Sequence, residues 1–142
     1  DDVKMHLEFT AARDLDTERH TVNRIASAVH SVGCDTSELK EMMNVLELER
    51  ERGSDSVLAN IILSLDVVMN ELNLERFHTH TKNFLCVVTR KDYGIEPEKI
   101  RNSLLFGGYA AVAKTTTGHI PDREDLNKDY DFHFSREGLD EM

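Results

Sequence analysis

The alternation of hydrophobic and polar residues predicts a strand near the start of the chain. Over residues 3–10 the two kinds alternate, as a half-buried strand requires. The polar side carries His6 and Glu8, so an imidazole and a carboxylate are expected to share one face. The other side carries the hydrophobic residues Val3, Met5, Leu7 and Phe9.

Spacings of three and four between hydrophobic residues predict two helices next. The first is expected to begin with Asp16 as its N-cap and to stop at Gly33. The second opens at Asp35, which forms a capping-box pattern with Glu38, and ends in the charged stretch 47–53. Its hydrophobic face is Leu39, Met42, Met43 and Leu46.

A third helix and two short strands are predicted in the middle of the chain. The helix is expected to be capped by Ser54 or Asp55 and has a wide apolar stripe that suits packing on a sheet. The apolar stripe of this helix consists of Leu58, Ile61, Ile62, Leu65, Val68, Met69 and Leu72.

Residues 76–81 and 84–89 are strand candidates, which are either neighbours or one bent strand.

A last helix is predicted from Pro97, a residue typical of the first helical turn, to a C-terminal Gly118. Gly107 and Gly108 weaken this helix, so another part of the protein is expected to pack closely there. The residues after it are mostly charged, with a short strand expected near Phe132.

The order of these elements indicates an α/β fold. About three strands are too few for a sheet that helices cover on both faces, so the sheet is expected to be incomplete and the chain to be a piece of a longer protein. An open sheet edge predicts homodimerisation through that edge.

Composition narrows the classes of function. The chain has 142 residues, of which 39% are hydrophobic and 31% charged, as in an ordinary single folding unit. A formal charge of −10 without a basic stripe argues against nucleic-acid or membrane partners. Two cysteines outside any paired spacing indicate neither a disulfide framework nor a zinc motif, which favours a cytoplasmic location.

Three polar constellations are candidates for chemistry. His6-Leu7-Glu8 places two ligand-type side chains on one strand face, although an ordinary exposed face explains the same pattern. The capping-box carboxylate Glu38 would lie at a helix N-terminus, where it is suited to hold the water shell of a hard divalent cation. His78 and His80 share a strand face, and a metal-binding domain built from these histidines with His6 and Glu8 is one hypothesis. Nothing in the sequence fixes the two pairs near each other.

The ordered set of motifs resembles the archaeal-type ADP-dependent glucokinase and phosphofructokinase family. The resemblance runs from about Lys4 to Leu139, and its first motif, HxE, is matched by His6 and Glu8. Further segments that carry it are Ser31-Val32-Gly33, Asp35 to Leu39, Leu74 to Thr81 and Ser103 to Gly107.

The resemblance implies a ribokinase-like three-layer α/β fold, with residues 1–120 in the large domain and 121–142 as a charged tail. It implies that Glu8 and Glu38 position magnesium (Mg2+) on the phosphates of ADP, the phosphoryl donor. His80 and Thr81 correspond to the segment that borders the adenine pocket. Asp35 stands where the family's NxxE motif has Asn, which adds a negative charge near the phosphates.

The implied function is phosphate transfer from ADP to a sugar hydroxyl in glycolysis, with fructose 6-phosphate favoured and glucose as the alternative. The family's catalytic Asp belongs to a GxGD motif, which this sequence does not contain. We therefore expect the chain alone to be inactive. A second hypothesis is a truncated relative that binds a nucleotide or a protein without catalysis.

Overall fold

The computed structural model describes residues 4–11, 14–49, 56–81 and 84–130, and the chain divides into two compact units at Tyr93 and Gly94. The elements of the first are β1 (His6–Glu8), α1 (Leu15–Ala28), β2 (Ser31–Asp35), α2 (Thr36–Val45), α3 (Val57–Glu71), β3 (Arg76–His80) and β4 (Leu85–Thr89). The second contains α4 (Pro97–Thr117) and the 3-10 helix η1 (Asp125–Asn127).

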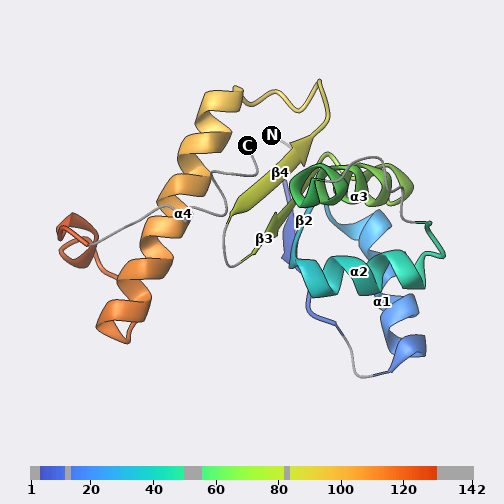
Figure 1. Ribbon diagram of the computed structural model, residues 1–142, viewed down its shortest axis with the longest axis horizontal. Coiled ribbons are helices and arrows are strands. Elements are labelled where there is room, and N and C mark those ends of the chain that lie inside the picture. Colours follow the sequence, from blue (N-terminus) through green and yellow to red (C-terminus); the bar gives the residue numbers. More distant parts are fainter. Residues whose placement is uncertain (1–3, 12–13, 50–55, 82–83, 131–142) are drawn as a thin grey trace. The chain divides into compact units, whose positions relative to one another are not determined.

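The first unit is a mixed α/β structure around a four-stranded sheet of order β1-β2-β3-β4. The first three strands are parallel, and β4 is antiparallel to β3. Helices α1, α2 and α3 lie together (Figure 1), with α2 and α3 in contact with the strands and α1 in contact with α2. The expected α/β class is confirmed.

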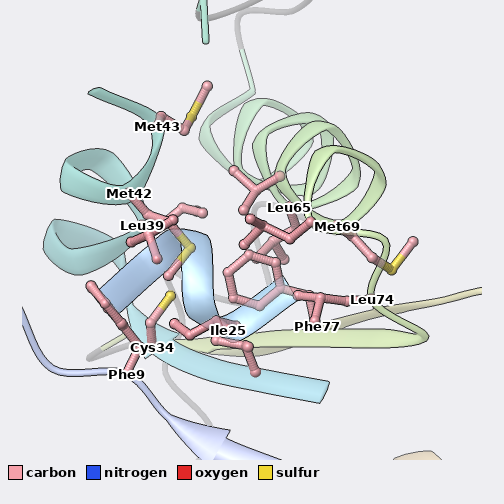
Figure 2. Packing of buried hydrophobic residues seen from close by; sticks show 14 of the residues in the cluster. Phe9, Ile25, Cys34, Leu39, Met42, Met43, Leu65, Met69, Leu74 and Phe77 are labelled. Carbon is pink, nitrogen blue, oxygen red and sulfur yellow. The ribbon is translucent and has the colours of Figure 1, made fainter. Parts of the chain in front are cut away.

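A single hydrophobic core fills the space between these helices and the sheet (Figure 2). Phe77 of β3 and Cys34 of β2 are fully buried in it, together with Met42 of α2 and Leu65 of α3. Because side chains alternate along a strand, the neighbours of these strand residues face the opposite side of the sheet. That opposite side carries the polar residues considered below.

The sequence analysis missed β2, and this strand is central in the sheet. The first helix begins at N-cap Asp14 rather than Asp16 and ends at Ala28, while Gly33 lies inside β2 rather than at a helix end. The error has a physical reason. Four of the five residues of β2 are buried, so it shows no polar alternation, and Val29 and Val32 fit a helical spacing equally well.

The other expected elements are present with small changes. The opening strand is limited to His6–Glu8, and 76–81 and 84–89 are antiparallel neighbours. The third helix is capped by Ser56, whose hydroxyl accepts from the backbone N–H of Ala59; residues 54 and 55 lie outside the described residues.

Helix α4 of the second unit begins with Pro97 and ends at Gly118 in the left-handed conformation, both as expected. The close packing expected at Gly107 and Gly108 is not found at Gly107 among the described residues, because a Cβ there would meet no atom within 4 Å. Tyr109 of α4 donates a hydrogen bond to the carbonyl of Lys128, and its ring packs edge-on against Tyr130. The strand expected near Phe132 lies outside the described residues. Among the described residues, no helix combines the length and apolar character that crossing a membrane requires.

Candidate functional site

The parallel strands bring their carboxyl ends to one edge of the sheet. In this register Glu8 of β1 stands beside Gly33 of β2, which stands beside His78 of β3. One step further along, Asp35 stands beside His80. Residues from three distant segments therefore meet at the carboxyl ends of the strands, where α/β sheets commonly bind ligands.

His6, Glu8 and His78 form a compact polar cluster. Nε2 of His6 lies 3.0 Å from Oε1 of Glu8, and Nε2 of His78 lies 3.1 Å from the same oxygen. The two imidazole rings are stacked, with centroids 5.2 Å apart. The sequence placed His6 and Glu8 together and offered His78 and His80 as further metal ligands; the structure brings His78 beside them, and His80 is not among the three grouped donors.

Gly33 makes this convergence across β2 possible. A Cβ at this position would lie 2.3 Å from Cε1 of His78 and 2.4 Å from Oε1 of Glu8. Such distances are shorter than any real contact, so a side chain at Gly33 would displace one or both groups. The absence of a side chain is therefore a requirement of the cluster.

Burial governs the charge of His78. Burial lowers its pKa to about 4, although Glu8 opposes this change, so the ring is neutral at neutral pH. Its Nδ1 is buried and has no hydrogen-bond partner among the described residues. Glu8, in contrast, has a side chain that is 58% exposed, so its carboxylate is accessible to a ligand.

On the other side of His6, Nδ1 lies 2.6 Å from Oγ of Ser31. Ser31 is itself buried, at 5% exposure, and opens the central strand β2. This contact holds the ring with its Nε2 toward Glu8. Ser31 and Gly33 were missed as site residues because they belong to the strand that the sequence analysis assigned to a helix end.

The capping box predicted at α2 is present. Oδ1 of Asp35 accepts from the backbone N–H groups of Ser37 and Glu38, at 2.7 and 2.8 Å. Oε2 of Glu38 accepts in turn from the backbone N–H of Asp35, at 2.8 Å. A hydrogen bond from the Ser37 hydroxyl, together with these amides, lowers the pKa of Asp35, so its carboxylate is ionised.

The three acidic side chains all act electrostatically on one buried thiol. Burial, together with the charges of Glu38, Asp35 and Glu8, raises the pKa of Cys34 to about 12. All three carboxylates are therefore within electrostatic reach of the same point in β2. The thiol is protonated at neutral pH and has no nucleophilic character.

His80 and Thr81 lie at the end of β3. His80 is exposed beside Asp35, whereas Thr81 takes part in the turn toward β4. The Thr81 hydroxyl accepts from the backbone N–H of Phe84 at 2.9 Å, and the Thr81 N–H donates to the Phe84 carbonyl at 2.9 Å. These contacts give Thr81 a structural role, and the contact with adenine stays a prediction.

The donor atoms at this edge suit a divalent cation. Carboxylates such as Glu8 and Glu38 are the protein ligands that magnesium takes, usually with waters and substrate phosphates. The N-terminus of α2, which carries Glu38, also favours a phosphate group. Around Glu8, however, two imidazole nitrogens add donors that magnesium does not prefer.

A parallel α/β sheet with ionisable groups at the carboxyl ends of its strands defines a class of ligand-binding proteins, many of which bind nucleotides. A family profile described as "ADP-specific Phosphofructokinase/Glucokinase conserved region" matches residues 1–141. The chain therefore belongs to the ADP-specific phosphofructokinase/glucokinase family.

Similar proteins agree with this assignment. An ADP-specific phosphofructokinase of Pyrococcus horikoshii is 32% identical over 127 residues, which are 87% of this chain and 28% of that protein. An ADP-dependent glucose/glucosamine kinase of Pyrococcus abyssi is 31% identical over 97% of this chain and 30% of its own length. The chain thus spans about 30% of the length of these relatives.

Solved structures share the fold. A structure described as an ADP-dependent kinase complex with fructose-6-phosphate and ADPbetaS matches with a TM-score of 0.86 and 29% sequence identity. The match covers 99% of this chain and 32% of the chain in that structure. The last common ancestor of ADP-dependent phosphofructokinases from Methanosarcinales also has a TM-score of 0.86, with 28% identity over 98% of this chain and 30% of its own.

Proposed function

We propose that this chain supplies part of the nucleotide and metal site of a kinase that transfers phosphate from ADP to a sugar hydroxyl. Fructose 6-phosphate is the favoured acceptor and glucose the alternative. The observation that carries the proposal is that the HxE and DxxE segments, 25 or more residues apart along the chain, meet at the carboxyl edge of one parallel sheet in a member of this family. Names of relatives support both acceptors.

Each acidic residue has a proposed role. Glu8 and Glu38 would hold magnesium, partly through waters, and magnesium would neutralise the phosphate charge that develops during transfer. His6 and His78 direct their Nε2 atoms at Oε1 of Glu8 and so orient its carboxylate. His80 and Thr81 would border the adenine. Because the sequence contains no GxGD, proton removal from the sugar is not assigned to any residue of this chain.

Calorimetry of ADP binding with and without magnesium tests this proposal. The parent chain is expected to bind ADP only with magnesium, and the double variant Glu8→Ala, Glu38→Ala is expected to bind at least tenfold more weakly, since each lost metal contact costs roughly 1 kcal/mol or more. Glu71→Ala, which removes an exposed carboxylate at the end of α3, is the matched control and should bind as the parent does. Equal binding by the double variant and the parent would refute the assigned site.

The second candidate function is nucleotide or protein binding without catalysis. One observation favours it: an ionised Asp35 stands where the family's NxxE motif has Asn. The full gene decides between the candidates. A reading frame that continues into GxGD, with ADP-dependent sugar phosphorylation by its product, removes this second candidate.

A further inference from the structure

The cluster around Glu8 has the composition of a transition-metal site. Two imidazole nitrogens and one carboxylate oxygen, contributed by His6, His78 and Glu8, lie within 4.8 Å of one another. Magnesium prefers six oxygen ligands in an octahedron, whereas imidazole with carboxylate suits zinc, nickel and cobalt. The three donors therefore suit a transition metal better than the magnesium proposed for Glu8 and Glu38.

We propose that His6, Glu8 and His78 bind a transition-metal ion of the zinc class directly, in a site that shares Glu8 with the proposed magnesium site. Zinc ligands lie about 2.0–2.2 Å from the ion, so two ligand atoms of a tetrahedral site stand about 3.3–3.6 Å apart. The distances of 3.0 and 3.1 Å from Oε1 of Glu8 to the two Nε2 atoms need only a small expansion.

The surroundings prepare the ligands for such an ion. A metal-binding histidine normally uses its second nitrogen in a hydrogen bond that fixes the ring. Nδ1 of His6 has this partner in the buried Ser31, at 2.6 Å. Nδ1 of His78 is buried and has no such partner among the described residues, so this ring is held by packing and by its contact with Glu8. Gly33 provides the space in which the donors converge.

The site is also open on one side. The side chains of Glu8 and His6 are 58% and 36% exposed, which leaves room for a water or a substrate oxygen as the fourth ligand. Catalytic zinc sites have this arrangement, with three protein ligands and a fourth position that water or substrate occupies. An ion bound here occupies Glu8, and we expect it to weaken magnesium-dependent ADP binding. The ion's own binding does not depend on the proposed kinase function.

Cobalt and zinc titrations of the metal-free chain test this inference. Cobalt is expected to give the intense visible absorption of four-coordinate sites, and zinc should bleach it at one equivalent while excess magnesium should not. Loss of a ligand should exceed the 10–100-fold effect of losing a supporting hydrogen bond, so His78→Asn and His6→Gln are expected to weaken zinc binding by at least about 100-fold. Ser31→Ala should weaken it by about 10–100-fold.

His80→Asn is the matched control, since His80 lies two residues along the same face of β3 and outside the cluster, and it should leave zinc affinity unchanged. Circular dichroism verifies that each variant is folded. His6→Gln, on the edge strand β1, keeps the test decisive if His78→Asn is unfolded. Absence of the cobalt spectrum from the parent, or zinc affinity that both cluster variants retain, overturns the inference.

The Glu38→Ala variant separates this inference from the proposed function. It should weaken magnesium-dependent ADP binding and leave zinc affinity unchanged, because Glu38 is not among the three clustered donors. Zinc binding without ADP binding contradicts only the kinase proposal. ADP binding without zinc binding contradicts only the transition-metal site.

Discussion

Gly33 is the residue on which the geometry of the site depends most directly. Its missing side chain lets Glu8 and His78 approach each other across the central strand β2. The substitution Gly33→Ala would place a Cβ 2.5 Å or less from atoms of both groups. Glu8 is exposed and moves easily, whereas His78 is only 14% exposed and must be forced from its place.

We therefore predict that Gly33→Ala lowers the free energy of unfolding by about 1–3 kcal/mol, the usual cost of overpacking, and abolishes both zinc and magnesium-ADP binding. Urea unfolding and calorimetry measure the two effects. Gly107→Ala is the control with the opposite sign, because its Cβ meets open space in an exposed helix and should stabilise by about 0.5–1 kcal/mol. A Gly33→Ala protein with unchanged binding would contradict the role given to this glycine.

The sequence predicted His6 and Glu8 as partners because they are two residues apart on one strand, where the alternation of side chains alone places them on the same face. His78 was considered as a metal ligand without any reason to place it near them. The missing information was the register between β1, β2 and β3, which residues far apart in the chain determine.

Among the elements, α2 was predicted most completely, since its start depends on contacts within four residues. The Asp35 carboxylate receives two backbone amides and the Ser37 hydroxyl, and Glu38 returns the contact. Strand β2, which ends where this helix begins, was missed because its burial removes the polar alternation that reveals strands. Whether a segment is a helix or a strand was thus predictable where hydrogen bonds between nearby residues determine it, as in α2. It was ambiguous where burial in the sheet determines it, as in β2.

Two substitutions at Asp35 separate its structural role from its charge. Asp35→Ala removes the N-cap and should lower the free energy of unfolding by about 0.5–2 kcal/mol. Asp35→Asn keeps the cap, so its stability should match the parent's, and it removes a negative charge at the proposed phosphate site. We expect Asp35→Asn to bind magnesium-ADP several-fold more tightly, measured by calorimetry. Weaker binding by this variant would argue that the charge is used to hold the cation.

The unit formed by α4 and η1 contains a carboxylate whose charge should control its stability in acid. A hydrogen bond from Lys128, supported by one involving His119, lowers the pKa of Asp125 to about 2. Because this value lies below the unfolded value of about 4, the stabilisation is complete above about pH 4 and is lost as the pH falls toward 2.

We predict that this unit unfolds in that pH window and that Asp125→Asn is less stable at neutral pH but loses this pH dependence. Tyrosine fluorescence reports on it, since the chain has three tyrosines and no tryptophan, and Tyr109 and Tyr130 pack together in this unit. An acid transition that is the same in both proteins would show that other carboxylates control it.

For the whole molecule, self-association remains a prediction. Within the described residues, β1 and β4 are the edges of the sheet, and Leu85 on β4 is 42% exposed. An unpaired edge with an apolar side chain favours pairing with another chain, and lysine at an edge opposes it. We expect sedimentation to show a dimer at high concentration and Leu85→Lys to shift the equilibrium toward monomer. A parent that stays monomeric at high concentration would contradict this.

The sequence by itself determined what neighbouring residues control: the paired His6 and Glu8, the capping box of α2, and the Pro97 and Gly118 limits of α4. The tertiary structure decided that Ser31–Asp35 is a central strand and that His78 completes the cluster at Glu8. The physical reason is the parallel pairing of β1, β2 and β3. Helices join these three strands, so which of their residues stand side by side depends on how the helices pack and not on any local pattern.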